Sequence, residues 1–150
     1  MKKIKIFIGT GFYSGFTPVA PGTAGSIVAF FIFLIPGFEN LYIISFAIIF
    51  SILIGIPLGN YFENIYGKDP GIFTLDEFIG TWIAFLFVPK HWLILIIGFL
   101  LWRILDILKP FPANKAEKLT GGVGIVLDDI ISGVYSLIII HIFITLFNFS

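Results

Sequence analysis

The charged side chains of this 150-residue chain are confined to short stretches, and most of the sequence between them is apolar. All of the Lys, Arg, Asp and Glu residues except Glu39 and Lys90 lie in Met1–Lys5, Glu63–Glu77 and Arg103–Asp129. The last two stretches end in adjacent acidic pairs, Asp76-Glu77 and Asp128-Asp129, and each pair leads directly into an apolar run. Charge beside a bilayer is costly, so carboxylates held there usually bind an ion or act on a substrate. The pattern therefore predicts a membrane enzyme with a metal-dependent site at one face.

Composition narrows the class of protein further. The chain is 58% hydrophobic, contains 19 Phe residues and is only 12% charged, whereas roughly 25% of the residues in an ordinary soluble domain are charged. Its formal net charge is zero, which leaves no basic footprint for nucleic acid. The absence of cysteine excludes thiol nucleophiles, disulfides and zinc–thiolate sites. We expect a single membrane domain over residues 1–150.

Apolar runs of membrane length determine the expected fold. Asn40–Phe62 and Ile130–Ser150 carry no charge, and each is long enough to cross a hydrocarbon layer of about 30 Å at roughly 1.5 Å per residue. Three shorter candidates are Ala24–Ile35, Leu75–Val88 and Trp92–Leu108. We expect an all-α integral membrane helical bundle of about four to five spans, some short or broken, with motif loops on the cytoplasmic side. An alternative remains open for the last two of these runs, which could form a re-entrant pair of helices instead of two spans.

The distribution of basic residues orients this bundle. With five spans and the N-terminus inside, Lys90 falls on the outer side and every other basic residue falls on the cytoplasmic side. The cytoplasmic set is Lys2, Lys3, Lys5, Lys68, Arg103, Lys109, Lys115 and Lys118. This asymmetry agrees with the positive-inside rule, and it places both acidic pairs at the cytoplasmic face. The apolar run after the N-terminal lysines is shorter than the roughly 7–15 residues of a signal-peptide core, so we interpret those lysines as a cytoplasmic anchor.

A glycine-rich segment, Gly9–Ser26, leads into the first apolar run and ends in the sequence Pro-Gly-Thr-Ala-Gly-Ser. Free N–H groups at a helix start, together with glycines that allow close approach, form an anion site. Thr23, Gly25 and Ser26 are therefore candidate substrate-binding residues. The structural alternative is a turn in which Thr23 or Ser26 only caps the helix.

The two acidic pairs are candidate cation sites. Adjacent carboxylates repel one another, and a hard cation with oxygen ligands relieves that repulsion. The candidate metal ligands are Asp76, Glu77, Asp128 and Asp129. For the first pair, the alternative is a favourable interaction with the dipole of a helix N-terminus. Gly121 and Gly122 precede the second pair, and their unhindered backbone makes them further candidates for substrate binding.

A third motif places a cation, a carboxylate and a second cation three residues apart, at Arg103, Asp106 and Lys109. On a helix they form one polar stripe, which Pro110 is expected to end. Arg103 is suited to clamp a phosphate, and Asp106 either binds a metal or orients Arg103. The alternative is an intramembrane Arg–Asp pair that neutralises itself. Arg103, Asp106 and Lys109 join Asp128 and Asp129 as the candidate catalytic residues.

The residues that other kinds of catalytic site require are missing from the predicted cytoplasmic face. His91 falls on the outer side and His141 lies deep in the last apolar run, so we expect both to be structural. A Ser-His-Asp or Cys-His arrangement cannot be assembled on the cytoplasmic face. What remains there is carboxylates, one arginine, several lysines and glycine loops, which are the groups used in metal-assisted phosphoryl chemistry.

Taken together, these segments resemble phosphatidylglycerophosphatase A, a family of bacterial membrane lipid phosphatases. The matching pieces are Gly9-Thr-Gly with Pro21-Gly-Thr-Ala-Gly-Ser, Asp76-Glu77-Phe-Ile-Gly80, Arg103-Ile-Leu-Asp106-Ile-Leu-Lys109-Pro-Phe-Pro112, and Gly121-Gly-Val-Gly-Ile-Val-Leu-Asp128-Asp129. They occur in the family's order across nearly the whole chain. Trp102 and Leu105 stand where phenylalanines are common, and Ser132 stands where alanine is usual. None of these departures removes a charged group.

The resemblance implies Mg²⁺-dependent hydrolysis of phosphatidylglycerophosphate to phosphatidylglycerol and phosphate, on the cytoplasmic side of the bacterial inner membrane. Under this hypothesis the acidic pairs hold one or two Mg²⁺ ions, Arg103 and Lys109 neutralise the phosphomonoester, and the glycine segments add N–H donors. The nucleophile is a metal-held water or, alternatively, Asp128 or Asp129 through a covalent aspartyl-phosphate. The expected partner is a phospholipid in the bilayer. Two other functions remain open: dephosphorylation of another lipid or isoprenoid phosphate, and a small cation-binding membrane transporter.

Overall fold

The computed structural model describes residues 2–147, and within that range all regular secondary structure is helical. In chain order the elements are α1 (Lys2–Gly9), the 3-10 turn η1 (Ser14–Phe16), α2 (Pro21–Leu34), α3 (Leu41–Tyr66), α4 (Leu75–Ala84), α5 (Trp92–Leu108), α6 (Ala113–Ala116) and α7 (Gly122–Leu146). The all-α prediction is confirmed. Met1 and the last three residues of the final predicted span lie outside the described part of the chain.

Two helices, α3 and α7, are long and apolar enough to cross a membrane. The outward face of α3 is itself apolar: Tyr42, Phe46 and Leu53 are 84%, 69% and 66% exposed. Water-soluble proteins rarely leave so much contiguous apolar surface uncovered, whereas lipid tails cover it favourably. A helix forms most of its backbone hydrogen bonds within itself, as a bilayer requires, although Pro57 inside α3 has no N–H to donate. The fold is a membrane helical bundle, as predicted.

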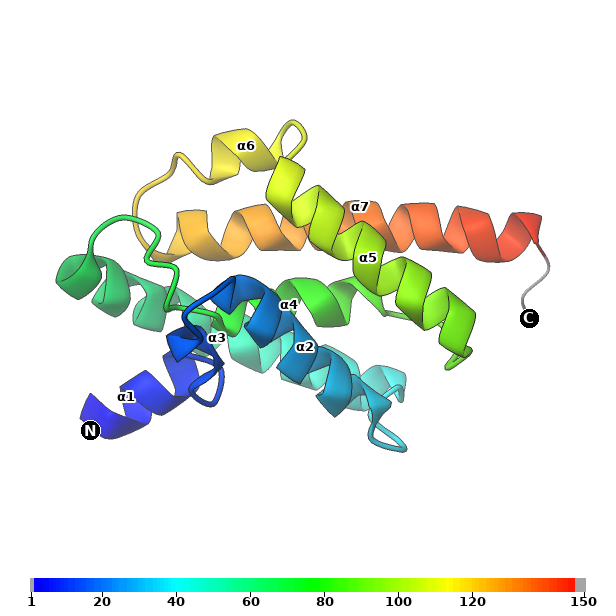
Figure 1. Ribbon diagram of the computed structural model, residues 1–150, viewed down its shortest axis with the longest axis horizontal. Helices are drawn as coiled ribbons and strands as arrows, with labels where there is room; N and C mark the ends of the chain where they lie inside the picture. The colour runs from blue at the N-terminus through cyan, green and yellow to red at the C-terminus, as the bar shows by residue number, and fades with distance from the viewer. Residues whose placement is uncertain (1, 148–150) are drawn as a thin grey trace.

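The helix α4, which falls within the predicted span Leu75–Val88, lies at the centre of the bundle. Every residue of α4 is buried, and the helix packs against α2, α3, α5 and α7 (Figure 1). The Trp82 indole N–H donates a hydrogen bond of 3.0 Å to the Ala29 carbonyl of α2, and Gly80 leaves room for the Trp102 ring of α5. At ten residues, α4 rises only about 15 Å. It therefore covers about half of a bilayer, less than Leu75–Val88 was expected to cover.

The last long helix, α7, begins earlier than its charge-free run predicted. Because it starts at Gly122, Asp128 and Asp129 lie inside the helix, about two turns from its start, rather than at the mouth of the predicted span. The Gly122 N–H donates to Asn60 Oδ1 of α3 at 2.8 Å, and a side chain at position 122 would collide with the Ile56 carbonyl. Close contact with α3 thus determines where α7 begins, and hydropathy does not report such a contact.

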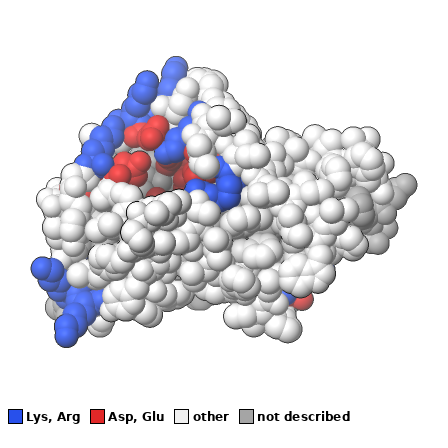
Figure 2. Space-filling model, viewed as in Figure 1, with Lys and Arg blue, Asp and Glu red and all other residues white. Residues whose placement is uncertain are grey.

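The two ends of the bundle differ in polarity. The α3–α4 and α6–α7 connections lie toward the left of Figure 1 together with α1, and the α2–α3 and α4–α5 connections lie toward the right. Figure 2 shows most of the visible charged side chains on the left. On the right, Lys90 and Glu39 join the two connections through an ion pair of 2.7 Å. Charge is therefore segregated along the bundle.

Candidate active site

The first turn of α4 is held in place by the N-terminal glycine-rich segment. The Thr74 N–H donates to the Gly9 carbonyl at 2.9 Å. Gly25 of α2 packs so closely that a Cβ there would lie 2.8 Å from the Thr74 Cβ. Asp76 and Glu77 follow within the first turn, and both side chains are buried. The segment that sequence reasoning treated as an anion cradle therefore fixes, at least in part, where the first acidic pair enters the bundle.

Three carboxylates from three helices converge beside this turn. Glu77 of α4, Asp106 of α5 and Asp129 of α7 each offer an oxygen, and these oxygens lie within 4.8 Å of one another. Asp106 and Asp129 are only 7% and 4% exposed. Asp76 lies on the wall of the same cavity, and its Oδ1 accepts the Glu77 N–H at 3.0 Å. The closest cluster thus includes Asp106, for which the sequence allowed two roles, as a metal ligand or as the group that orients Arg103.

Arg103 of α5 lies between two of these carboxylates. Its Nη1 pairs with Glu77 Oε2 and, at 3.0 Å, with Asp106 Oδ2. The same nitrogen donates to Ser26 Oγ at 3.0 Å, and Nη2 donates to Thr23 Oγ1 at 3.3 Å. Ser26 in turn donates to Glu77 Oε2 at 2.9 Å. The Arg103–Asp106 pair is therefore one part of a network that reaches the start of α2.

Lys109 connects a second group of acids. It follows the last turn of α5 with a left-handed backbone, at φ 44°, and its Nζ pairs with Asp128 Oδ2 at 2.7 Å and with Glu117 Oε1 at 3.0 Å. Burial acts to lower the pKa of Lys109, but the hydrogen bonds to Asp128 and Glu117 and the charges of Asp128 and Asp69 outweigh it and raise that pKa above its usual range. Lys109 is therefore a fixed positive charge beside Asp128.

The carboxylates and Lys109 line a cavity of about 150 Å³, whereas Arg103, Thr23, Gly25 and Ser26 lie outside its walls. Its walls are formed by Pro21, Gly22, Asp69, Gly71, Phe73, Asp76, Glu77, Asp106, Lys109, Asp128 and Asp129. Gly22 allows α2 to approach the site, because a Cβ there would collide with the Glu77 carboxylate. Asp69 is not among the candidate site residues that were named from the sequence. The available signal was that Asp69 belongs to the same charged stretch as Asp76 and Glu77.

Gly121 and Gly122 lie outside the walls of this cavity. A Cβ at Gly121 would collide with Asn60 Oδ1, and one at Gly122 would collide with the α3 backbone. Their small size therefore serves the contact between α7 and α3. The sequence pattern could not distinguish such a packing contact from a phosphate cradle, because both require glycine.

The cavity has the ligand chemistry of a hard divalent cation. Asp128 Oδ1 and Asp129 Oδ2 are buried and have no hydrogen-bond partner among the described residues. The acids that line the cavity outnumber the basic groups in contact with them, Arg103 and Lys109. Buried carboxylates without partners are costly, and a cation that takes oxygen ligands, such as Mg²⁺, relieves that cost. The residues present therefore fit Mg²⁺.

Comparison with known proteins agrees with this chemistry. The family model of phosphatidylglycerophosphatase A matches residues 7–144. A Bacteroides thetaiotaomicron protein named "Putative phosphatidylinositol-3-phosphatase" is 40% identical, over 93% of this chain and 92% of its own length. Two proteins named phosphatidylglycerophosphatase A are also similar. The one from Escherichia coli is 36% identical, over 86% of this chain and 77% of its own length.

The second, from Haemophilus influenzae, is 33% identical, over 93% of this chain and 91% of its own length. No solved structure matches the chain. The resemblance drawn from the four motifs is thus confirmed, as is the prediction of an enzyme that hydrolyses a phosphoric monoester. The chain belongs to the phosphatidylglycerophosphatase A family.

Proposed function

We propose that this protein is a Mg²⁺-dependent phosphatase that hydrolyses phosphatidylglycerophosphate to phosphatidylglycerol and phosphate at the cytoplasmic face of the bacterial inner membrane. The observation that carries the proposal is the convergence of Glu77, Asp106 and Asp129 within 4.8 Å, beside Arg103, in a chain of this family. The segregation of basic residues supports the orientation, because positive charge favours the cytoplasmic side.

Glu77, Asp106 and Asp129 would hold the cation. Each comes from a different helix, so the folded bundle assembles the ligand set. Bound there, Mg²⁺ supplies Lewis acidity to a phosphoryl oxygen and neutralises charge that develops during hydrolysis. Asp76 lies beside the cluster and is available for a second ion or for a ligand water.

Arg103 and Lys109 would bind the phosphomonoester. The guanidinium of Arg103 offers a planar pair of donors that matches two phosphate oxygens, and Thr23 and Ser26 hold it in orientation. Lys109 contributes a point charge at the cavity wall, where its pair with Asp128 fixes its position. The first turn of α2, which contains Gly22, brings helical N–H groups to the same cavity.

The reaction breaks the bond between phosphorus and the headgroup oxygen. A water oxygen attacks phosphorus, the headgroup alkoxide leaves, and the proton lost by the water is returned to that alkoxide through the site. Asp128 is suited to accept the proton first, because its Oδ1 is buried without a partner while Oδ2 is paired with Lys109. The acyl chains stay in the bilayer, so only the headgroup needs this polar cavity.

Phosphate release by the purified protein in detergent micelles tests the proposal. Phosphatidylglycerophosphate and phosphatidic acid would be compared, each with Mg²⁺ and with EDTA. We expect Mg²⁺-dependent release that favours the first lipid. Absence of release from both lipids, in protein shown to be folded by its melting transition, would contradict the proposal and favour another phosphorylated substrate or a transport function.

A second candidate substrate follows from the Bacteroides relative, which is named "Putative phosphatidylinositol-3-phosphatase". The same cavity chemistry serves a 3-phosphoinositide, because the hydrolysed group is again a phosphomonoester. Adding phosphatidylinositol 3-phosphate to the comparison separates the two. If kcat/KM for that lipid exceeds the value for phosphatidylglycerophosphate, the substrate assignment changes while the proposed roles of the carboxylates stand.

A further inference from the structure

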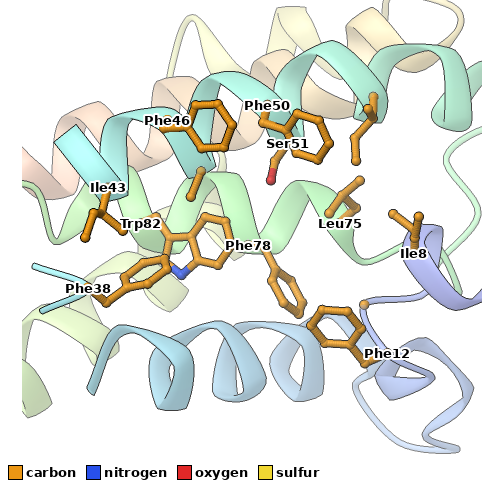
Figure 3. A pocket seen from close by; sticks show the side chains of 13 residues that line it. Ile8, Phe12, Phe38, Ile43, Phe46, Phe50, Ser51, Leu75, Phe78 and Trp82 are labelled. Atoms are coloured by element: carbon orange, nitrogen blue, oxygen red, sulfur yellow. The ribbon is translucent and has the colours of Figure 1, made fainter. Parts of the chain in front are cut away.

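We call the cavity lined by the carboxylates the catalytic cavity. A second concave surface lies on the other side of α4 from it. It is an apolar groove of about 430 Å³, whose walls include Phe46 and Phe50 of α3 and Phe78 and Trp82 of α4 (Figure 3). Phe78 follows Asp76 by two positions, which on a helix points the two side chains to nearly opposite faces. The carboxylates of the catalytic cavity do not line this groove.

The groove continues toward the N-terminus. A neighbouring apolar depression of about 340 Å³ shares Ile8, Phe50 and Ile54 with it and extends along α3 to Pro57. Lys5 of α1 lines this second part. We call the two depressions together the α1–α3 groove. From Ile43 to Pro57 the axis of α3 rises about 21 Å, more than half of a hydrocarbon layer of about 30 Å.

The end of the groove at α1 is basic. Lys2, Lys3 and Lys5 lie on this one short helix, and α1 contains no acidic residue. Lys5 Nζ lies 4.3 Å from the centre of the Tyr61 ring on α3, which holds its charge beside the groove. Lys2 and Lys3 are exposed. The residues that line the groove include no Asp or Glu, so nothing in its walls neutralises these three lysines.

An amphiphile with an anionic head and a long hydrocarbon tail matches both parts of this surface. Water in so apolar a groove is unfavourable, and the basic end attracts negative charge. Anionic phospholipids of the cytoplasmic leaflet are drawn to clusters of lysine, and their acyl chains suit a groove of this length. A zwitterionic lipid would fill the apolar part equally well but would gain little from the lysines.

We propose that the α1–α3 groove is a non-catalytic binding site for one anionic phospholipid, with an acyl chain between α3 and α4 and the headgroup at Lys2, Lys3 and Lys5. The chain would lie against Leu75 and Phe78, on the helix that carries the first acidic pair. A lipid that binds only the folded protein adds to its stability, so occupancy holds α4 in position from the side opposite the catalytic cavity.

Native mass spectrometry of the full chain, released from micelles that contain equal amounts of phosphatidylglycerol and phosphatidylcholine, tests the proposal. We expect one retained lipid per protein, with phosphatidylglycerol preferred. Lys5→Gln should lower that preference roughly fivefold, since one lysine near an anionic surface contributes about that factor. The triple change of Lys2, Lys3 and Lys5 to Gln should abolish it. Lys2 and Lys3 are exposed and Lys5 is half-buried at the rim of the groove, and Gln keeps most of the length of the side chain, so the variants are expected to fold.

Two substitutions on α3 form a matched pair for the tail. Ala47 lines the groove, and Ala47→Phe fills it, whereas Ile49→Phe places the same ring on an exposed position outside the groove. We expect Ala47→Phe to reduce retention of either lipid several-fold and Ile49→Phe to leave it unchanged. Equal retention by both variants, or equal retention of the two lipids by the unmodified protein, would overturn the proposal.

Lipid held in the catalytic cavity gives a different result. A phosphatidylglycerol preference that survives the triple lysine change and Ala47→Phe, but disappears in Asp129→Asn, would show that the retained lipid is product in the catalytic cavity. That outcome would overturn the groove site while supporting the proposed function. Conversely, if the groove variants remove the phosphatidylglycerol preference, the groove site is supported whether or not the protein hydrolyses phosphatidylglycerophosphate.

Discussion

Among residues 2–147, two ion-paired regions differ in burial and in balance of charge. Lys90 and Glu39 form a one-to-one pair at 2.7 Å between two connections, with side chains 25% and 45% exposed. Arg103 and Lys109 instead lie among an excess of carboxylates, where the Asp128 side chain is only 3% exposed. The first region satisfies its own charges, and the second does not.

This difference shows which region has a function beyond stability. An exposed pair is worth little because water and salt screen it. A buried cluster with unpartnered carboxylate oxygens is a poor way to gain stability, because desolvation exceeds the attraction. Such a cluster is expected where a ligand completes it. We therefore propose that a cation completes the catalytic cavity, whereas the Lys90–Glu39 pair needs nothing further.

The largest expected effect comes from Asp129→Asn, which keeps the shape of a side chain in the cluster and removes its charge. We expect phosphate release to fall about 100-fold or more, since a lost metal ligand costs at least as much as the loss of its supporting contacts. The melting temperature without Mg²⁺ should change little or rise, because the buried charge is removed. Near-normal activity in this variant would remove Asp129 from the proposed ligand set.

A titration with Mg²⁺ tests the same difference between the catalytic cavity and the Lys90–Glu39 pair through stability instead of activity. A bound ion at 100 times its Kd adds about 2.7 kcal/mol to the stability of the folded state. Titration with Mg²⁺ should therefore raise the melting temperature of the unmodified protein and of Glu39→Gln, and leave that of Asp129→Asn unchanged. Equal responses in all three proteins would place the stabilising ion outside the cluster.

Arg103→Lys tests whether Arg103 does more than balance charge. Lysine keeps the charge but loses the planar donors that contact Ser26 and Thr23 and that match a phosphate. We expect kcat/KM to fall by about tenfold to 100-fold, which corresponds to roughly 1.4–2.7 kcal/mol. Activity within twofold of the unmodified protein would mean that any cation suffices at this position.

Gly122→Ala separates packing from phosphate binding. A Cβ at this position collides with the Ile56 carbonyl, so we expect a loss of about 1–3 kcal/mol in the free energy of unfolding, measured as a lower melting temperature. KM for the lipid substrate should stay unchanged in the protein that remains folded. A raised KM with an unchanged melting temperature would restore the substrate-binding role that the sequence suggested.

The smallest effect is expected from Glu39→Gln. Its pair with Lys90 lowers the pKa of Glu39, so any contribution to stability is present at neutral pH and is lost as the pH falls through that lowered value. We expect phosphate release and the melting temperature at neutral pH to match those of the unmodified protein. A large loss of activity would show that the Lys90–Glu39 pair is coupled to the catalytic cavity.

The sequence predicted the helical class, the family and the charged groups of the site because each leaves a local signal. Charge-free runs indicated membrane helices, and the acidic pairs indicated the cavity. It also predicted α5 over Trp92–Leu108, with the bounds that the structure has. The charged positions on α5 then placed Arg103 and Asp106 on one face.

What the sequence left undetermined depends on contacts between distant segments. The grouping of Asp106 with Glu77 and Asp129 requires three helices to meet, and no spacing along the chain encodes that meeting. The start of α7 depends on Asn60 and Ile56 of α3. Asp69 reaches the cavity only because the α3–α4 connection folds back over it. Local patterns therefore identified most of the residues, and tertiary packing decided their grouping.

The most direct test of the central claim is phosphate release from phosphatidylglycerophosphate by the unmodified protein, after EDTA treatment and again after Mg²⁺ is restored. The proposed cation site predicts that release stops with EDTA and returns with Mg²⁺ in the unmodified protein and in Glu39→Gln, but not in Asp129→Asn. Release that continues at full rate in EDTA would contradict the claim that the buried carboxylates act through a divalent cation.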